Sequence, residues 1–168
     1  DGLNIEASYV PSSGGAKDGS TDAGITYTGV DGLTIGLATG TDATGSTPAA
    51  SADVDEQAMY ITYAYDAFTF GYQSNESDSV TAGADSEYSG FAVSYAVSDD
   101  ISVSIANSEI DREGTSTNTD QTTEHTAISA SYTMGSMALK ATRSDVSNAG
   151  GNEDRDGEGY AVELSFAF

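Results

Sequence analysis

Residues 59–73 read MYITYAYDAFTFGYQ, and this stretch decides the fold. Large apolar side chains occupy every second position on both sides of Asp66-Ala67, which is typical of two β-strands joined by a two-residue turn. Successive side chains of a strand point to opposite sides. The stretch therefore predicts an antiparallel hairpin with one apolar face and one face of small or polar residues.

The same alternation recurs along the whole chain, whereas helical spacing is almost absent. Gly, Asp and Ser mark the breaks between the alternating segments. We predict an all-β protein of ten strands. These strands cover residues 3–9, about 25–27, 33–38, 59–65, 68–73, 91–97, 101–106, 127–132, 137–142 and 160–168.

The connections between these strands alternate strictly in length. Tight turns are predicted at Asp31-Gly32, Asp66-Ala67, Ser98–Asp100 and Gly135-Ser136. Longer polar connections are predicted at residues 11–22, 40–56, 74–86, 110–122 and 145–157, and they hold most of the acidic residues. Because alternate turns of an up-and-down sheet lie at opposite ends, one end of the sheet should carry only tight turns and the other should carry the long loops.

Composition excludes several functional classes. The chain has 168 residues, with 27 Asp and Glu against 5 Lys and Arg, and a formal charge of -22. Nucleic-acid binding needs a basic face, which this chain lacks. Without cysteine there is no disulfide scaffold and no thiolate site, and a single histidine excludes a His-rich metal centre. No apolar run is long enough for a membrane-spanning helix, and we expect any leader peptide to have been removed already.

The two faces of the predicted strands favour a membrane barrel over a soluble sandwich. One face is aliphatic at mid-strand and aromatic towards the ends, as at interfaces between lipid and water. The other face is mostly Ser, Thr, Ala and Gly, which suits a water-filled interior. We therefore predict a single transmembrane antiparallel up-and-down β-barrel domain over residues 1–168, without a second domain. The residues expected to line its lumen are Asn4, Glu6, Thr34, Thr62, Lys140, Thr142, Glu163 and Ser165.

The last strand, YAVELSFAF at residues 160–168, and the strand openings DGLNI and DGLTI at residues 1–5 and 31–35 resemble those of Gram-negative outer-membrane porins, most closely the α-proteobacterial type. The resemblance implies an outer-membrane channel for passive diffusion, not an enzyme, without cofactors. It also implies contact with lipid bilayer and lipopolysaccharide, and homotrimers. The residues resembling the signal read by the barrel-assembly machinery are Tyr160, Val162, Leu164, Phe166 and Phe168.

Porins of this type have about sixteen strands and a constriction loop early in the chain. Ten strands beginning at a turn-like Asp1-Gly2 favour the C-terminal portion of such a barrel. A complete ten-stranded barrel is the alternative, because even strand numbers are allowed.

Three features suggest sites of their own. Arg143 falls on the apolar face near the long-loop end, where it can reach lipid headgroups, unless a bulge turns it inward. Asn152, Asp154 and Asp156, with Glu163 further on, match a calcium-loop spacing weakly. Asp53, Asp55 and Glu56 form another weak acidic group. His125 is a rim residue in the plain interpretation and a catalytic base in the less favoured one.

Two functions compete with a diffusion channel. An outer-membrane receptor or adhesin would use the acidic loops to bind a partner such as a phage. A secreted, calcium-stabilised β-repeat adhesin would leave the alternation of loop lengths unexplained. For the channel itself, the acidic loops predict a mild preference for cations, because their summed field concentrates cations at the mouth.

Overall fold

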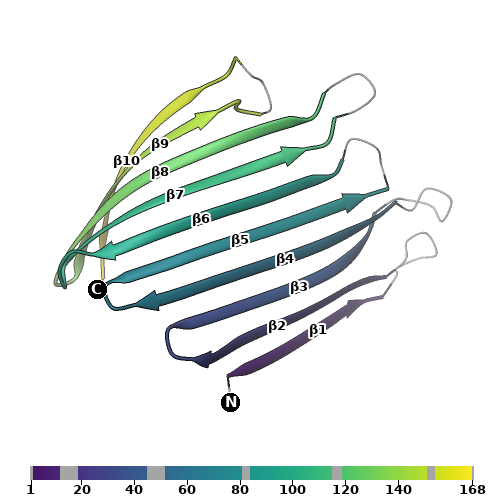
Figure 1. Cartoon of the computed structure of the whole chain (residues 1–168), viewed down its shortest axis with the longest axis horizontal. Coiled ribbons are helices and arrows are strands. Elements are labelled where there is room, and N and C mark those ends of the chain that lie inside the picture. Colours follow the sequence, from purple (N-terminus) through teal and green to yellow (C-terminus); the bar gives the residue numbers. More distant parts are fainter. Residues whose placement is uncertain are drawn as a thin grey trace.

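The computed structural model describes residues 2–11, 19–44, 52–80, 84–114, 119–150 and 154–167, and these form one antiparallel sheet (Figure 1). Each strand is hydrogen-bonded to its neighbours in sequence, so the predicted all-β up-and-down topology is confirmed. The strands are β1 (Leu3–Val10), β2 (Ser20–Val30), β3 (Leu33–Thr44), β4 (Ala52–Tyr65), β5 (Phe68–Ser79), β6 (Ser86–Ala96), β7 (Ile101–Arg112), β8 (Gln121–Met134), β9 (Met137–Ser147) and β10 (Gly157–Phe166).

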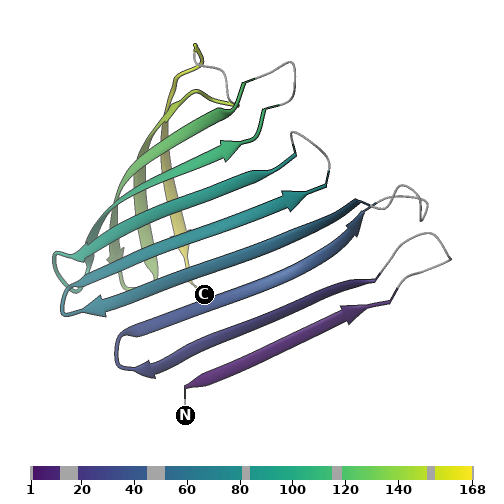
Figure 2. The ribbon, with the colours of Figure 1, turned by 45° about the vertical axis from the view of Figure 1, so that its right-hand side comes forward.

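The sheet is curved but open. β1 and β10 lie at its two margins, and each pairs with one neighbour only (Figure 2). Within the described ranges β1 and β10 do not contact one another. A closed ten-stranded barrel is therefore not what these strands form.

The strands are longer, and the polar connections shorter, than the sequence predicted. The connections at the long-loop end run over residues 11–19, 45–51, 80–85, 113–120 and 148–156. The prediction ended each strand where apolar alternation stopped. Pairing continues further because polar side chains bond across the strands, as where Thr41 donates to Asp55 at 2.8 Å and Thr122 donates to Asp111.

The predicted tight turns are confirmed. Gly32 follows β2 with φ at 72°, and Asp66 follows β4 with φ at 53°. Positive φ suits the two-residue turns that match the twist of antiparallel strands. At Gly32 a side chain is excluded for a second reason, because a Cβ atom would collide with the carbonyl oxygen of Ala64.

The sheet has no apolar core. Gly36 is the only buried residue among those whose exposure is described, and no large side chain there is fully buried. Ile5 is 69% exposed, and Tyr160 and Val162 are each 74% exposed. The apolar rows therefore do not meet one another in a dry centre. No helix in the described ranges is long and apolar enough to cross a membrane.

Gly36 is buried by an aromatic ring on the next strand. It lies opposite Tyr60 in the register of β3 and β4, and a Cβ atom at Gly36 would overlap the Tyr60 ring. Gly71 lies on the same face, but its Cβ would meet only Thr62 Cγ2, at 3.9 Å. Glycine at position 36 thus lets Tyr60 lie flat against the sheet.

We expect Gly36→Val to displace the Tyr60 ring and to lower the free energy of unfolding by about 1–3 kcal/mol, as overpacking does. Urea unfolding of the protein in lipid vesicles, followed by circular dichroism, measures this change. Gly71→Val is the matched control and should cost clearly less. Equal losses in the two variants would contradict the role given to the Tyr60 ring.

Candidate functional site

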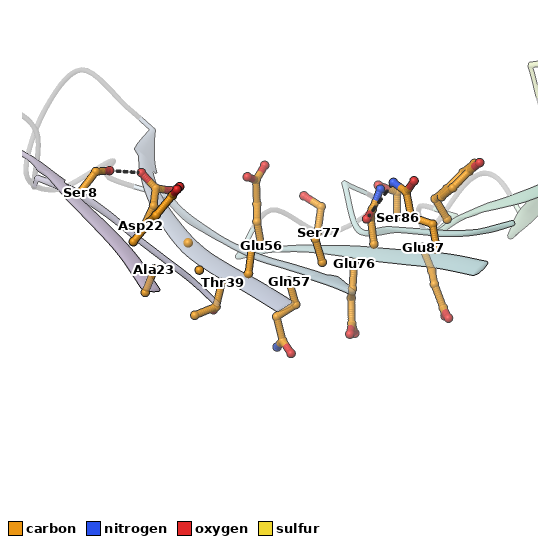
Figure 3. Close-up of a pocket in the computed structure, with 18 of the residues that line it drawn as sticks. Ser8, Asp22, Ala23, Thr39, Glu56, Gln57, Glu76, Ser77, Ser86 and Glu87 are labelled. Carbon is orange, nitrogen blue, oxygen red and sulfur yellow. Dashed lines mark hydrogen bonds between the residues drawn. The ribbon is translucent and has the colours of Figure 1, made fainter. Parts of the chain in front are cut away.

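The two faces of the sheet differ in chemistry throughout. Cross-strand partners share a face, so the register traces each face from strand to strand. One such row runs from Leu33 through Tyr63, Phe70, Val93, Ile105 and Ile128. The row beside it runs from Thr34 through Thr62, Gly71, Ala92, Ala106 and Ala127. Thr62 lies six positions from Glu56 on β4, so the second row shares the face of Glu56, which is the concave side of the sheet (Figures 2 and 3). The first row therefore belongs to the convex face.

On the convex face the apolar stretch ends at a sharp boundary. On β4, outward positions change from Tyr65, Tyr63, Ile61 and Met59 to Gln57 and Asp55, and the other strands from β3 to β10 change in the same way. On β4 the apolar stretch runs over the seven residues Met59–Tyr65 and covers about 23 Å along the strand before tilt is allowed for. That length is comparable with the ~25 Å apolar band of membrane barrels.

Aromatic rings gather on this face beside the tight turn that joins β4 to β5. The rings of Phe68 and Tyr95 lie 4.7 Å apart, and Tyr63 stacks on Tyr65 at 6.3 Å. Phe68 also stacks on Phe70 at 6.1 Å. Rings at one end of an apolar band are typical of the aromatic girdles of membrane barrels.

All eight residues predicted to line a lumen lie on the concave face, although they do not form one cluster. Asn4 donates to Glu6 Oε1 at 2.7 Å, and Thr34 lies opposite Thr62. At the other margin of the sheet Lys140 lies opposite Glu163. Thr142 and Ser165 share that face by alternation along β9 and β10.

A hollow of about 800 Å³ lies on the concave face, towards the long-loop ends of β1 to β7. Its acidic side chains are Glu6, Asp22 and Glu56, and Figure 3 shows Asp22 and Glu56 on the same side of the sheet. Asp22 and Glu56 are both register partners of Gly40, so a residue without a side chain separates them. The carboxylates therefore stand above a floor of small residues and face open space.

Hydrogen bonds hold part of this acidic lining in place. Ser8 donates to Asp22 at 2.7 Å. Outside the hollow, on the same face, Ser20 donates to Asp42 at 2.6 Å. Glu76 and Glu87 also border the hollow, but their side chains project to the opposite face (Figure 3). The negative charge of the hollow thus comes from β1 to β4.

The sequence prediction left most of the acidic residues of the concave face unplaced. Asp22, Asp42 and Glu56 fell in predicted loops, so no face was assigned to them. Arg112 fell in a predicted loop too, and it lies on the concave face at the end of β7. Continuing the alternation three positions beyond Ile25 and Met59 would have placed Asp22 and Glu56. Asp42 and Arg112 lie five and seven positions beyond Leu37 and Ile105, too far for the apolar alternation to place them.

Arg143 lies on the convex face, at the first polar position above the apolar stretch of β9. It pairs with Asp145 at 2.9 Å and with Glu158 at 3.1 Å. The register on both sides of β9 is regular there, so no bulge turns Arg143 inward. Two carboxylates of this chain compensate its charge.

The structure does not bring the residues of the two weak metal-site predictions together. Asp156 accepts a bond from the Asn148 backbone N–H at 3.2 Å, and Glu163 lies well inside β10 on the concave face. Asn152 lies outside the described residues, and those described hold no metal-binding group of three His, Asp or Glu. Asp55 and Glu56 are consecutive residues of β4, so their side chains lie on opposite faces and do not converge.

His125 does not start a strand, contrary to the expectation from the sequence. β8 begins at Gln121, so His125 lies four positions inside it, on the concave face and opposite Ser108.

The assembly-signal residues Tyr160, Val162, Leu164 and Phe166 share the convex face of β10 and are all exposed. Phe168 lies outside the described residues.

Comparisons with known proteins found similar structures but no similar sequence family. No family model and no curated protein matches the chain. The anion-selective porin from Comamonas acidovorans is similar in structure, with a TM-score of 0.77 and 13% identity over 99% of this chain and 56% of that chain. OmpT (in-vitro folded), an outer membrane protein of Vibrio cholerae, has a TM-score of 0.67 and 14% identity over 99% of this chain and 61% of that chain. The chain thus spans little more than half the length of these two structures, and its ten-stranded sheet matches roughly half of a porin barrel.

Proposed function

We propose that this chain is the C-terminal part of an outer-membrane porin, a barrel of about sixteen strands that lets small hydrophilic solutes and ions diffuse across the outer membrane. Transport would be passive, by size exclusion with an electrostatic bias, without a chemical step or a cofactor. Residues 1–168 would belong to a single barrel domain.

One observation carries this proposal: a single sheet that lacks a core exposes an apolar face on one side and a polar face on the other. Exposed apolar side chains cover the convex face from Ile5 on β1 to Val162 on β10. Patches beyond a few hundred Å² are rare on soluble proteins. Lipid against the convex face and water against the concave face satisfy both surfaces.

The free edges of β1 and β10 support a larger barrel. In hydrocarbon an unpaired backbone group costs several kcal/mol, so membrane sheets close upon themselves. β1 and β10 are separated at the two margins of the sheet (Figure 1). Further strands between them would pair both edges and complete the wall.

The charges of the concave face support a mild cation preference. Glu6, Asp22, Asp42 and Glu56 gather on β1 to β4, whereas the basic residues of this face in the described strands, Lys140 and Arg112, lie on β9 and β7. Fixed carboxylates along a narrow wall raise the local concentration of cations. The preference proposed for this chain is therefore the opposite of that of the Comamonas acidovorans porin, which is described as anion-selective.

The proposed setting brings partners with it. The convex face would contact the bilayer and, above the apolar boundary, lipopolysaccharide. The terminal strand would be read by the barrel-assembly machinery, and copies of the barrel would form homotrimers. A role as phage receptor stays secondary, since the connections at the long-loop end have only 6 to 9 residues.

We expect the protein to show cation preference in planar bilayers held in a potassium chloride gradient. The reversal potential should give a cation-to-anion permeability ratio above one near 0.1 M salt. The ratio should approach the bulk value near 1 M, because the screening length falls from ~10 Å to ~3 Å. A reversal potential of anion-selective sign at 0.1 M would contradict this expectation.

The triple variant Glu6→Gln, Asp22→Asn, Glu56→Gln should lower the permeability ratio towards one, because it removes three carboxylates from the acidic hollow. The matched control is Asp55→Asn, Glu109→Gln, Glu124→Gln, which removes three carboxylates from the convex face. The control should retain the native reversal potential. If both variants shift it equally, overall charge sets the selectivity and the concave lining does not.

A further inference from the structure

The concave face carries a second polar zone, built from one row of the register across β4 to β8. Tyr60 lies opposite Gln73, Gln73 opposite Gly90, Gly90 opposite Ser108, and Ser108 opposite His125. Strands in a sheet lie about 4.8 Å apart, so these five positions span roughly 19 Å around the wall. The row lines a hollow of about 380 Å³.

Tyr88 fills the glycine position in this row. Its side chain lies along β6, so that a Cβ atom at Gly90 would approach the Tyr88 hydroxyl oxygen to 2.7 Å. Tyr60 lies against Gly36 in a similar way. The hollow therefore has two tyrosines on its wall, and its floor is made of Gly71, Ala92, Ala106 and Ala127.

Most polar side chains of this row and its hollow have no partner in the fold; the exception is Gln73, whose amide donates to Asn75 Oδ1 at 3.3 Å. Within the described part of the chain, the side chains of Tyr60, Tyr88, Ser108 and His125 have no hydrogen-bond partner. Elsewhere on the same face, neighbours satisfy one another: Ser102 bonds to Ser131 at 2.7 Å and Ser129 bonds to Thr142 at 2.9 Å. The row thus presents unused donors and acceptors beside two aromatic rings.

We propose that this row binds an uncharged sugar, a short oligosaccharide lying across β4 to β8. Phenol, carboxamide, hydroxyl and imidazole groups each donate and accept hydrogen bonds, as the hydroxyls of a sugar require. The tyrosine rings supply apolar surface with a polar tip for the C–H faces of the sugar rings. A few polar groups on an otherwise small and aromatic lining are typical of small-molecule sites.

The charges on this face favour an uncharged ligand. The carboxylates on β1 to β4 disfavour an anion nearby and attract a cation to themselves. Neither the row nor the floor of its hollow carries a carboxylate. The inference depends on the proposed function only in placing the row on the lumen wall, because binding itself does not require conduction.

Saturation-transfer NMR on the protein in micelles of a detergent without a sugar headgroup tests this inference. Cellotriose should receive saturation and bind more tightly than glucose, because it reaches more of the row. Gln73→Leu and His125→Leu should each weaken cellotriose binding about fivefold, as expected for losing one hydrogen bond. Thr142→Val, which alters a residue of the same face outside the row, should bind like the native protein.

Several outcomes would overturn the inference. They are an absence of saturation transfer to cellotriose, equal affinity in the native protein and both row variants, or stronger binding of gluconate or spermidine than of cellotriose. Circular dichroism of each variant confirms that the sheet is retained. Because no channel is needed, loss of sugar binding with intact conductance would reject the sugar site alone. Loss of conductance with intact sugar binding would reject the channel alone.

Discussion

Everything in this structure depends on the hydrogen bonds between neighbouring strands. With almost no buried side chain among the residues whose exposure is described, the ten strands are held together by a continuous backbone ladder and by side-chain pairs across it. In water such a sheet would expose its whole apolar face. In a bilayer the same ladder is the structure that satisfies backbone polar groups without water. The stability of this sheet therefore depends on the surrounding solvent as well as on the sequence.

The ladder also explains how a simple alternation of residues along each strand produces two different surfaces. A side chain changes face at every step, so residues as close as Tyr63 and Ala64 meet different surroundings. Small residues on the concave side do more than leave space. Gly36 allows Tyr60 to lie flat, and Gly40 separates Asp22 from Glu56. The chemistry of the wall is thus set by where side chains are missing as well as by where they are present.

The sequence predicts the sheet well because its signal is local. Tyr65-Asp66-Ala67-Phe68 encodes a turn, and the apolar alternation on either side encodes two strands, with no need for distant contacts. The long-loop ends of the strands were missed for a physical reason. Asp53-Val54-Asp55-Glu56-Gln57 lacks apolar alternation, yet it stays in β4 because its backbone pairs with β3 and β5.

The candidate site was only partly predictable for the same reason. Glu6, Lys140 and Glu163 have apolar neighbours on both sides in the sequence, so the alternation placed them on the polar face. Asp42 and Arg112 could be placed only through the register of neighbouring strands. The row from Tyr60 to His125 is harder still, since its five members come from five strands and only the sheet brings them together.

The measurement that tests the central claim most directly is a cysteine scan along β5, for which the chain is suited because it has no cysteine of its own. Spin labels attached at Phe68→Cys through Gln73→Cys in lipid vesicles report access to oxygen, which dissolves in lipid, and to a water-soluble nickel reagent. We predict a period of two residues, with positions 68, 70 and 72 facing lipid and positions 69, 71 and 73 facing water. Accessibility without this alternation, or shielding of both sets of positions from lipid and water alike, would contradict the account.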